Sequence, residues 1–189
     1  QNKELEAKYA NIGTLANLTN GQNDQRLSLH RFILSVLLDD ILIVASQHLA
    51  QMTHHRYQLV RENEVNDARS ASGLNLAVTD AYTGIQRSTK TLSGGESFQA
   101  ALALALGLSE VVQQYSGGIK LDMLFVDEGF GSLDEQALDA AIDVLANLRA
   151  SGRSVGIISH VRELKERIDM RIDVHKGQYG SHITTRVNN

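Results

Sequence analysis

The segment that most constrains the fold is Leu92-Ser93-Gly94-Gly95-Glu96, because a long apolar run, Ala100 to Leu108, follows it almost directly. Ser93 and Glu96 have the S-x-x-E spacing of a capping box, so we expect a helix to begin here and to continue to about Gln114. Two glycines in its first turn leave backbone N–H groups uncovered by side chains. A helix N-terminus carries partial positive charge and unpaired donors, so this turn suits a phosphate oxygen, although an ordinary capped helix has the same pattern.

Polar residues also follow two apolar runs that are expected to be strands. The run Met123–Val126 ends in Asp127 and Glu128, and the run 155–158 is followed by a serine and His160. In open α/β sheets ligands bind at the carboxyl ends of the strands. Between the runs, Ser132 and Glu135 have the spacing of a second capping box, which predicts a second helix.

The order of these four clusters resembles the second half of an ABC-type ATPase. Leu92–Glu96 resembles the signature motif, and Met123–Asp127 resembles Walker B with Glu128 as the catalytic glutamate. Ser132, Leu133 and Asp134 resemble the D-loop, and His160 resembles the switch histidine. The resemblance covers the chain from about Arg26 to its end. It implies an α/β fold: the carboxy-terminal lobe of an ABC-type, SMC-like ATPase head, with a mainly parallel sheet flanked by helices and a helical amino-terminal portion at a coiled-coil base.

Three features narrow the resemblance to SbcC-type proteins, the large subunits of bacterial SbcCD nucleases and relatives of the SMC proteins. Gly129 stands where transporter ATPases usually have proline, the gap between Glu96 and Met123 is long, and Asp80–Gly84 precedes the signature. The sequence contains no G-x-x-x-x-G-K-[ST] motif, the loop that holds ATP phosphates. In SMC-like proteins that Walker A loop lies in an amino-terminal segment. Because the chain opens at Gln1, we expect it to be a carboxy-terminal fragment.

The resemblance assigns roles to individual residues. It implies that Asp127 holds Mg²⁺, directly or through water, that Glu128 orients or deprotonates the attacking water, and that His160 hydrogen-bonds the γ-phosphate. It implies that the signature residues act in trans, on ATP held by the opposite head, with Asp134 at the same interface. The signature residues are Leu92, Ser93, Gly94, Gly95 and Glu96.

The function implied is ATP-driven closure of two heads that gates cleavage of DNA double-strand ends or hairpins during repair and recombination. The partners implied are an amino-terminal Walker A segment, a second identical head, an SbcD-type nuclease subunit and DNA. ATP and Mg²⁺ are the cofactors, Mn²⁺ is expected only in the nuclease subunit, and the isolated segment is expected to be inactive. Two alternatives are an SMC/RecN-like DNA tether without a nuclease and a transporter ATPase, against which Gly129 argues.

Composition sets broad limits. The chain has 189 residues, of which 42% are hydrophobic, a net charge of −4 and no cysteine. It therefore has enough apolar residues for a core, no global basic surface for DNA and no disulfides. We expect a bacterial cytoplasmic, nucleoid-associated protein, with no run apolar and long enough to span a bilayer and no membrane partner.

The remaining sequence divides into residues 1–18 and 26–189. Residues 1–18 are expected to be a helix, either the end of a coiled-coil arm or an amphipathic surface helix, and residues 26–189 the head. Further helices are expected at 26–52, after Ser132 and at 161–168, strands at 57–61, 74–78 and 154–158, a loop at 62–73, and a hairpin at 170–187. Arg87 and Lys90 are expected in a solvated loop, with a phosphate or DNA contact as the alternative. The pair His54-His55 lacks a third ligand nearby, which argues against a metal site.

Overall fold

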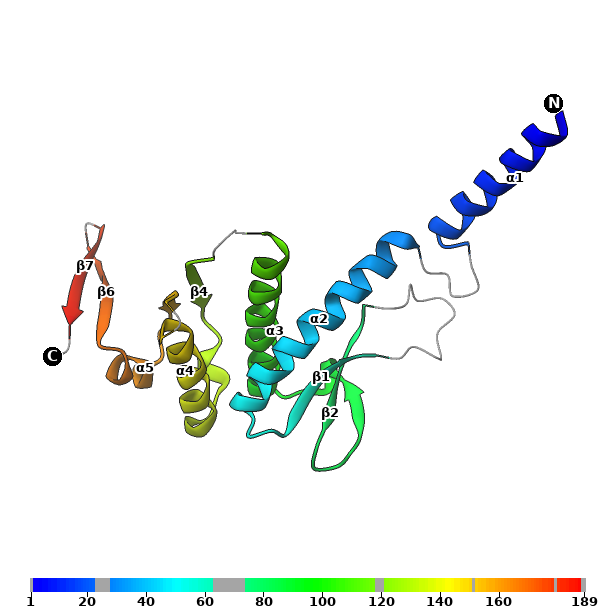
Figure 1. Cartoon of the computed structure of the whole chain (residues 1–189). Helices are drawn as coiled ribbons and strands as arrows, with labels where there is room; N and C mark the ends of the chain where they lie inside the picture. Colours follow the sequence, from blue (N-terminus) through cyan, green and yellow to red (C-terminus); the bar gives the residue numbers. More distant parts are fainter. Residues whose placement is uncertain are drawn as a thin grey trace.

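The computed structural model describes residues 2–22, 28–62, 74–117, 121–150, 152–178 and 180–187, with only the backbone of residues 2–8. Helix α1 extends away from the rest of the chain at one end, and a β-hairpin lies at the other end (Figure 1). In order, the elements are α1 (Asn2–Thr19), α2 (Leu29–Met52), β1 (Tyr57–Arg61), β2 (Leu76–Asp80), β3 (Gln86–Ser88), the 3₁₀ helix η1 (Thr89–Thr91), α3 (Gly94–Tyr115), β4 (Met123–Asp127), the 3₁₀ helix η2 (Phe130–Ser132), α4 (Glu135–Ala150), β5 (Ser154–Ile158), α5 (Arg162–Arg167), β6 (Met170–Gly177) and β7 (Gly180–Val187).

Helix α2 crosses α3, and this pair forms the centre of the fold (Figure 1). Ser28 caps α2, because its side chain accepts a hydrogen bond from the Arg31 N–H. The start expected at residue 26 lies outside the described residues. The face of α2 that enters the core holds Ser35, Leu42, Ala45, Ser46, Leu49 and Met52.

The opposite face of α2 is also apolar, and it is exposed. Its large side chains are Leu29, Phe32, Ile33, Val36 and Ile43. By length and composition α2 is long and apolar enough to cross a membrane, so the expectation that no such segment exists was wrong. Its middle nevertheless carries two acids that pair within the lobe, Asp39 with Arg61 and Asp40 with the hydroxyl of Tyr115. These pairs and the buried face make α2 a helix of the lobe's core.

The first sheet is antiparallel and has the order β1-β2-β3. Ser46 of α2 fixes β1 to the core, since its hydroxyl donates to the Leu59 carbonyl and accepts from the Leu59 N–H, both at 3.0 Å. Strand β2 lies two residues later than expected. Residues 86–91 form β3 and η1, so the expected loop before the signature is ordered secondary structure, while the loop expected at 63–73 lies outside the described residues.

Helix α3 begins and ends within a residue of its expected limits. Its core face contains Gln99, Ala100, Leu102, Ala103, Leu106, Gly107 and Val111. Ala101, Ala105 and Leu108 remain exposed, so the expectation of burial on several sides is met on one side only.

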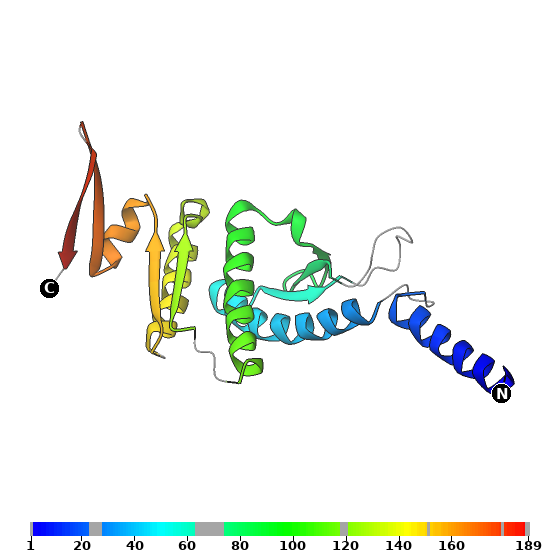
Figure 2. The same cartoon turned by 90° about the horizontal axis from the view of Figure 1, so that it is seen from above.

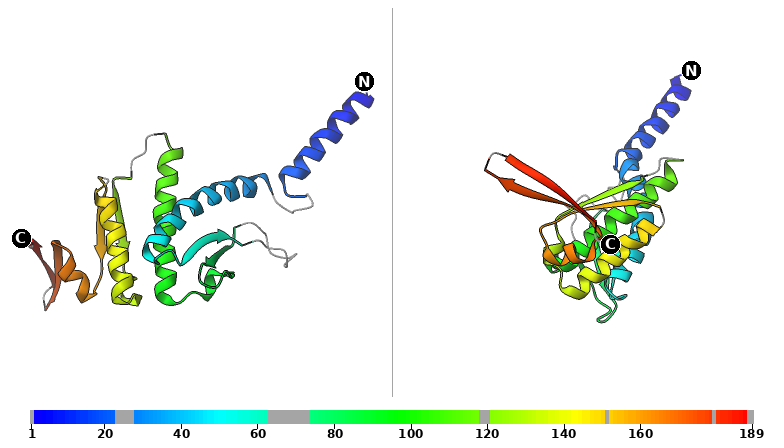
Figure 3. Two further views of the ribbon diagram at one scale, coloured as in Figure 1. Left: turned by 60° about the horizontal axis from the view of Figure 1, so that its bottom comes forward. Right: turned by 90° about the vertical axis from the view of Figure 1, so that its left-hand side faces the viewer.

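Strands β4 and β5 pair in parallel and are joined through α4, as expected. Helix α4 lies along one face of this pair (Figures 2 and 3). The expected capping box of Ser132 and Glu135 does not form. Asp134 caps α4 instead, since its Oδ1 accepts the Ala137 N–H at 2.8 Å, while Ser132 Oγ donates to the Gly129 carbonyl. A carboxylate nearer the helix takes the cap, and it is favoured there by the helix dipole.

The carboxy-terminal elements are α5 and a hairpin. Strands β6 and β7 pair from Met170 with Val187 to Gly177 with Gly180, which confirms the predicted hairpin. The hairpin projects beyond α5 at the end of the chain (Figure 1).

Candidate functional site

The signature turn at the start of α3 has the predicted capping box. The Glu96 N–H donates to Ser93 Oγ at 3.3 Å, and Glu96 Oε2 accepts the Ser93 N–H at 2.9 Å. Ser93 and Gly94 are exposed, so the first turn of α3 faces solvent. The open N-terminus of a 22-residue helix is suited to an anion.

The signature turn packs against the segment that resembles the D-loop. A Cβ on Gly95 would lie 2.8 Å from the Ser132 carbonyl oxygen and 3.5 Å from Leu133 Cδ2. A Cβ on Gly94 would lie 3.7 Å from Ser132 Cβ, which is an ordinary contact. Only glycine therefore fits the second position without a shift of backbone.

The signature helix also holds the turn after Walker B. The ring of Phe98 in α3 meets that of Phe130 edge to face, with centroids 4.9 Å apart. A Cβ on Gly129 would lie 2.2 Å from the Phe98 ring, and Gly129 has a φ of 95°. Both the space and the left-handed backbone require glycine here. The residue that distinguished this chain from transporter ATPases thus has a local physical cause.

Glu128 and His160 meet at the carboxyl end of the parallel pair. Asp127 is opposite Ile158 in the β4–β5 register, and the Glu128 N–H donates to the Ile158 carbonyl at 2.8 Å. His160 Nδ1 lies 2.8 Å from Glu128 Oε2. An ionised carboxylate only accepts, so the Nδ1–H of His160 donates and its Nε2 is left for a second partner. The two side chains are 82% and 50% exposed, which keeps the pair open to a ligand.

The backbone at Glu128 is unusual. Its φ is 58°, in the left-handed region that costs a non-glycine residue energy. This conformation turns the chain sharply after Asp127. The two consecutive carboxylates consequently leave the strand in different directions, with Glu128 directed at His160.

The predicted residues thus form two sets joined by one segment. The signature turn contacts Ser132 and Leu133, and Glu128 contacts His160. Residues 129–133 connect the two sets through the Phe98 contact. Of the D-loop residues, Asp134 serves as a helix cap, a use that its spacing did not predict.

Sequence reasoning missed a polar cluster behind the signature turn. Arg56 donates to Asp80 Oδ2 from Nε at 3.3 Å and Nη2 at 3.1 Å, and its guanidinium lies over the rings of Tyr57 and Tyr82. The Arg56 hydrogen bond lowers the pKa of the buried Asp80 carboxyl. Asp80 also accepts the Tyr82 N–H, which shapes the 80–85 turn. The acid at position 80 was noted only as part of a family pattern; its partner has no sequence signal.

Two other predicted features lie apart from this chemistry. His54 and His55 form an exposed turn with φ of 49° and 62°, and no cluster able to hold a metal occurs among the described residues. Lys90 is exposed, whereas Arg87 is held by hydrogen bonds to Thr91 and Tyr57.

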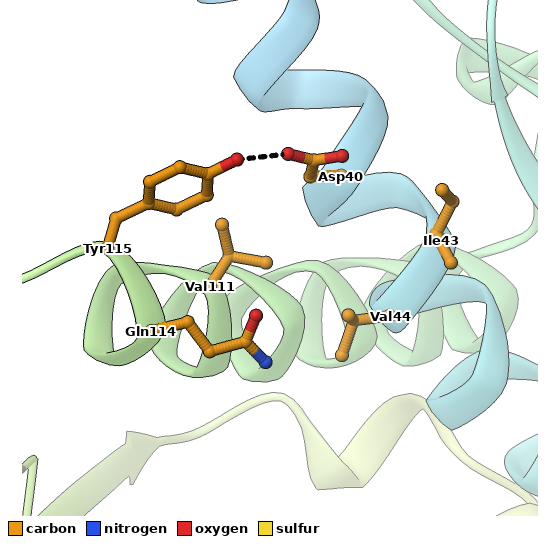
Figure 4. A pocket seen from close by; sticks show the side chains of 6 residues that line it. All are labelled: Asp40, Ile43, Val44, Val111, Gln114 and Tyr115. Carbon is orange, nitrogen blue, oxygen red and sulfur yellow. Dashed lines mark hydrogen bonds between the residues drawn. The ribbon is translucent and has the colours of Figure 1, made fainter.

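A pocket of about 330 Å³ opens where α2 crosses the end of α3 (Figure 4). Its lining residues are Asp40, Ile43, Val44, Val111, Gln114 and Tyr115. Tyr115 ends α3, whereas Ser93 caps its start, so the pocket lies roughly 30 Å along the helix from the signature turn. We therefore separate it from the candidate site.

The side chains present fit a nucleotide and its cation. An exposed carboxylate at the end of a strand, Asp127, is the oxygen ligand that Mg²⁺ prefers. Glu128 supplies a carboxylate and His160 a ring nitrogen beside it. The glycine turn supplies backbone donors for an anion.

Comparison with known proteins agrees with this geometry. Residues 63–147 match the family described as SbcC/RAD50-like, Walker B motif. The chain is 56% identical over 181 residues to the SbcC subunit of the nuclease SbcCD of Vibrio cholerae and 51% identical over 177 residues to that of Staphylococcus epidermidis. These matches cover 96% and 94% of the chain but 18% and 17% of the relatives, so the chain spans about a fifth of their length.

Solved structures share the fold at low identity. One, from a study of ATP-driven dimerization and DNA-stimulated activation of SMC ATPases, has a TM-score of 0.61 at 17% identity and covers 82% of this chain and 88% of its own. A second, the Smc head domain of Pyrococcus furiosus with an extended coiled coil bound to the C-terminal domain of ScpA, has a TM-score of 0.61 at 18% identity and covers 98% of this chain and 42% of its own. The fold is therefore that of an SMC-type ATPase head, which confirms the predicted α/β lobe. With the Walker B match and identities above 50% across nearly all of its length, the chain belongs to the SbcC/RAD50-like family.

Proposed function

We propose that the chain is the carboxy-terminal half of a split ATPase head, and that its Glu128–His160 pair hydrolyses ATP bound by an amino-terminal Walker A segment. The observation that carries the proposal is the 2.8 Å contact between these two side chains beside Asp127, at the open end of the parallel pair. The family membership and the SMC head fold support it.

Each residue has a defined task in this proposal. Bound Mg²⁺ neutralises phosphate charge, and Asp127 holds it directly or through a water. Glu128 orients the attacking water and accepts its proton, while His160 fixes the Glu128 carboxylate through Nδ1 and presents Nε2 to the γ-phosphate side. The left-handed backbone of Glu128 keeps the two carboxylates on separate tasks.

The signature turn serves the opposite head of a homodimer. Its exposed first turn offers the N–H groups of the glycines and the Ser93 hydroxyl to the phosphates held there. ATP then joins two heads and hydrolysis releases them. Asp134 and its neighbours, which contact the signature turn in this chain, lie at the same interface.

The assembly acts on DNA with an SbcD-type nuclease subunit, in the bacterial cytoplasm at the nucleoid. The relatives are named as SbcC subunits of the nuclease SbcCD, which supports such a partner. Head closure gates cleavage of DNA ends or hairpins, and Mn²⁺ belongs to the nuclease partner alone. Helix α1 is the end of the returning coiled-coil arm, which agrees with its position outside the body of the lobe (Figure 1).

ATPase activity of mixed segments tests the proposal. The chain alone is expected to be inactive, and activity is expected when the amino-terminal Walker A segment is added. Glu128→Gln should lower the rate of the mixture about 10²- to 10⁴-fold, because it removes the carboxylate that positions water. It should leave ATP-driven dimerisation intact, whereas Ser93→Arg should block dimerisation, as measured by light scattering.

The outcomes separate the alternatives. Turnover by the pure chain alone, abolished by Glu128→Gln, contradicts the split head. An assembled but inactive mixture contradicts the enzyme assignment. ATPase activity without recovery of a nuclease partner in a pull-down from the native host supports a DNA tether instead.

A further inference from the structure

The hydroxyl of Tyr57 lies at the centre of the hydrogen bonds behind the signature turn. Tyr57 is the first residue of β1 and is only 4% exposed. Its O–H donates to Glu96 Oε1 at 2.6 Å and accepts from Arg87 Nη2 at 3.2 Å. One buried oxygen therefore connects two residues that flank the signature turn.

The bond to Glu96 adds a third member to the capping box. Glu96 Oε2 already accepts the Ser93 N–H, which closes the turn on itself. A capping box needs no further partner, and by itself does not orient the helix start against another element. The second oxygen, Oε1, is fixed by Tyr57, so the carboxylate joins Ser93 to the first sheet. Burial acts to raise the pKa of Glu96, but the hydrogen bonds from Tyr57 and Ser93 and the charge of Arg87 lower it, so the group stays ionised.

The bond from Arg87 holds the other side of the turn. Arg87 Nη1 donates to the Thr91 carbonyl at 2.9 Å and to Thr91 Oγ1 at 2.8 Å. Thr91 immediately precedes the signature residues. The Arg87 guanidinium also lies 5.5 Å from the centre of the Tyr57 ring, which supports the same orientation.

We propose that Tyr57 is a positioning residue for the signature turn, whose hydroxyl aligns Ser93 and the glycines on the nucleotide of the opposite head through Glu96 and Arg87. This inference rests on the proposed function. A misplacement of about 1 Å costs up to about 100-fold in rate, so loss of the hydroxyl should lower hydrolysis about 10- to 100-fold at the site that this turn completes. Tyr57 would not touch the nucleotide, and it is therefore not a catalytic residue.

Tyr57→Phe is the test variant, because it removes the hydroxyl and keeps the ring. The chain offers a matched control in Tyr115, whose hydroxyl also donates to a carboxylate, Asp40 Oδ2, at 2.6 Å. Tyr115 lies at the other end of α3. In the complete head, assembled from this chain and the Walker A segment, Tyr57→Phe should slow ATP hydrolysis and Tyr115→Phe should not.

Heterodimers purified through two tags separate positioning from a general structural effect. In the first arrangement, one protomer carries both Glu128→Gln and Tyr57→Phe beside a wild-type protomer. The only working site then uses the altered signature turn, and activity should fall about 10- to 100-fold. In the second arrangement the substitutions are on opposite protomers, so the working site uses a wild-type turn and should keep the rate of a Glu128→Gln/wild-type heterodimer.

An equal loss in both arrangements, or no loss in either, overturns the positioning role. If the wild-type head hydrolyses no ATP, the proposed function fails and the inference is judged by amide hydrogen exchange in the same assembly. Tyr57→Phe should then speed exchange in residues 93–97 at least several-fold, while Tyr115→Phe leaves it unchanged. Unchanged exchange in Tyr57→Phe would show that the hydroxyl does not hold the turn.

Discussion

The left-handed backbone of Glu128 shows how single residues set this site. At the end of β4 the chain must turn so that Asp127 and Glu128 do not share a direction, and a φ of 58° accomplishes this. Gly129 follows with a φ of 95°, directly under the Phe98 ring. Strain of this kind, about 1–3 kcal/mol per residue, persists only where packing fixes it. Here the Phe98–Phe130 contact and the His160 hydrogen bond supply that packing.

The two signature glycines should respond oppositely to alanine. A Cβ on Gly95 would lie 2.8 Å from the Ser132 carbonyl, so Gly95→Ala should destabilise the chain by about 1–3 kcal/mol. A Cβ on Gly94 meets only an ordinary contact, so Gly94→Ala should be neutral or stabilise the helix by up to about 1 kcal/mol. Urea unfolding of both variants measures the difference. Equal losses of stability would show that the signature turn does not rest on the Ser132 backbone.

The site could be predicted from the sequence only where a residue acts through its own neighbours in the chain or through a general rule of sheet topology. The capping box of Ser93 and Glu96 is local, and it was predicted correctly. The contact of Glu128 with His160 spans 32 positions and followed from the rule that parallel strands collect their ends. Tyr57 reaches Glu96 across 39 positions with no motif of its own. Nothing in the local pattern distinguishes it from any other buried tyrosine.

At the scale of elements, helices were easier to predict than the faces they bury. Helix α2 has the expected extent, yet Phe32 and Val36 lie on its exposed face. Apolar residues surround much of this helix, so periodicity does not select which side meets α3. The second helix cap failed for a similar reason, because Ser132 and Asp134 both have capping side chains and only the fold decides between them.

Gly107 sets how closely α2 and α3 approach. A Cβ there would lie 2.7 Å from the Ala45 nitrogen and 2.8 Å from the Ile41 carbonyl oxygen, both in the backbone of α2. Gly107→Ala should therefore force the helices apart and destabilise the chain by about 1–3 kcal/mol, although alanine is the better helix former. Thermal unfolding followed by circular dichroism measures the change.

Gly13 of α1 is the control for Gly107. It is also a glycine inside a helix, but a Cβ there would meet nothing within 4 Å. Gly13→Ala should leave stability unchanged or raise it slightly. Because the obstruction at Gly107 is backbone, Ala45→Gly should not rescue Gly107→Ala; a rescue would place the clash in the side chain instead.

At the scale of the whole molecule, the chain exposes two apolar strand faces. One is on the parallel pair, where Met123 and Phe125 of β4 and Ile158 of β5 are more than half exposed. The other is on the hairpin, with Met170, Ile172, Val174, Ile183 and Val187. Parallel sheets are normally covered on both faces, whereas α4 lies along only one face of β4–β5 (Figures 2 and 3). Such faces indicate surfaces that are covered in an assembly.

We expect the Walker A segment to cover the open face of β4–β5, and Phe125 tests this. Its side chain is 64% exposed, so Phe125→Gln should change the unfolding free energy of the chain alone by no more than about 0.5 kcal/mol. Full burial of a phenylalanine is worth about 1.5–3 kcal/mol, so the same change should weaken binding of the Walker A segment about 10- to 100-fold. Ile85, 61% exposed at the turn between β2 and β3, provides the control, and Ile85→Asn should bind normally. Calorimetric titration of the two segments measures both constants. Wild-type affinity for Phe125→Gln would mean that the open face of the parallel pair is covered by something other than the Walker A segment.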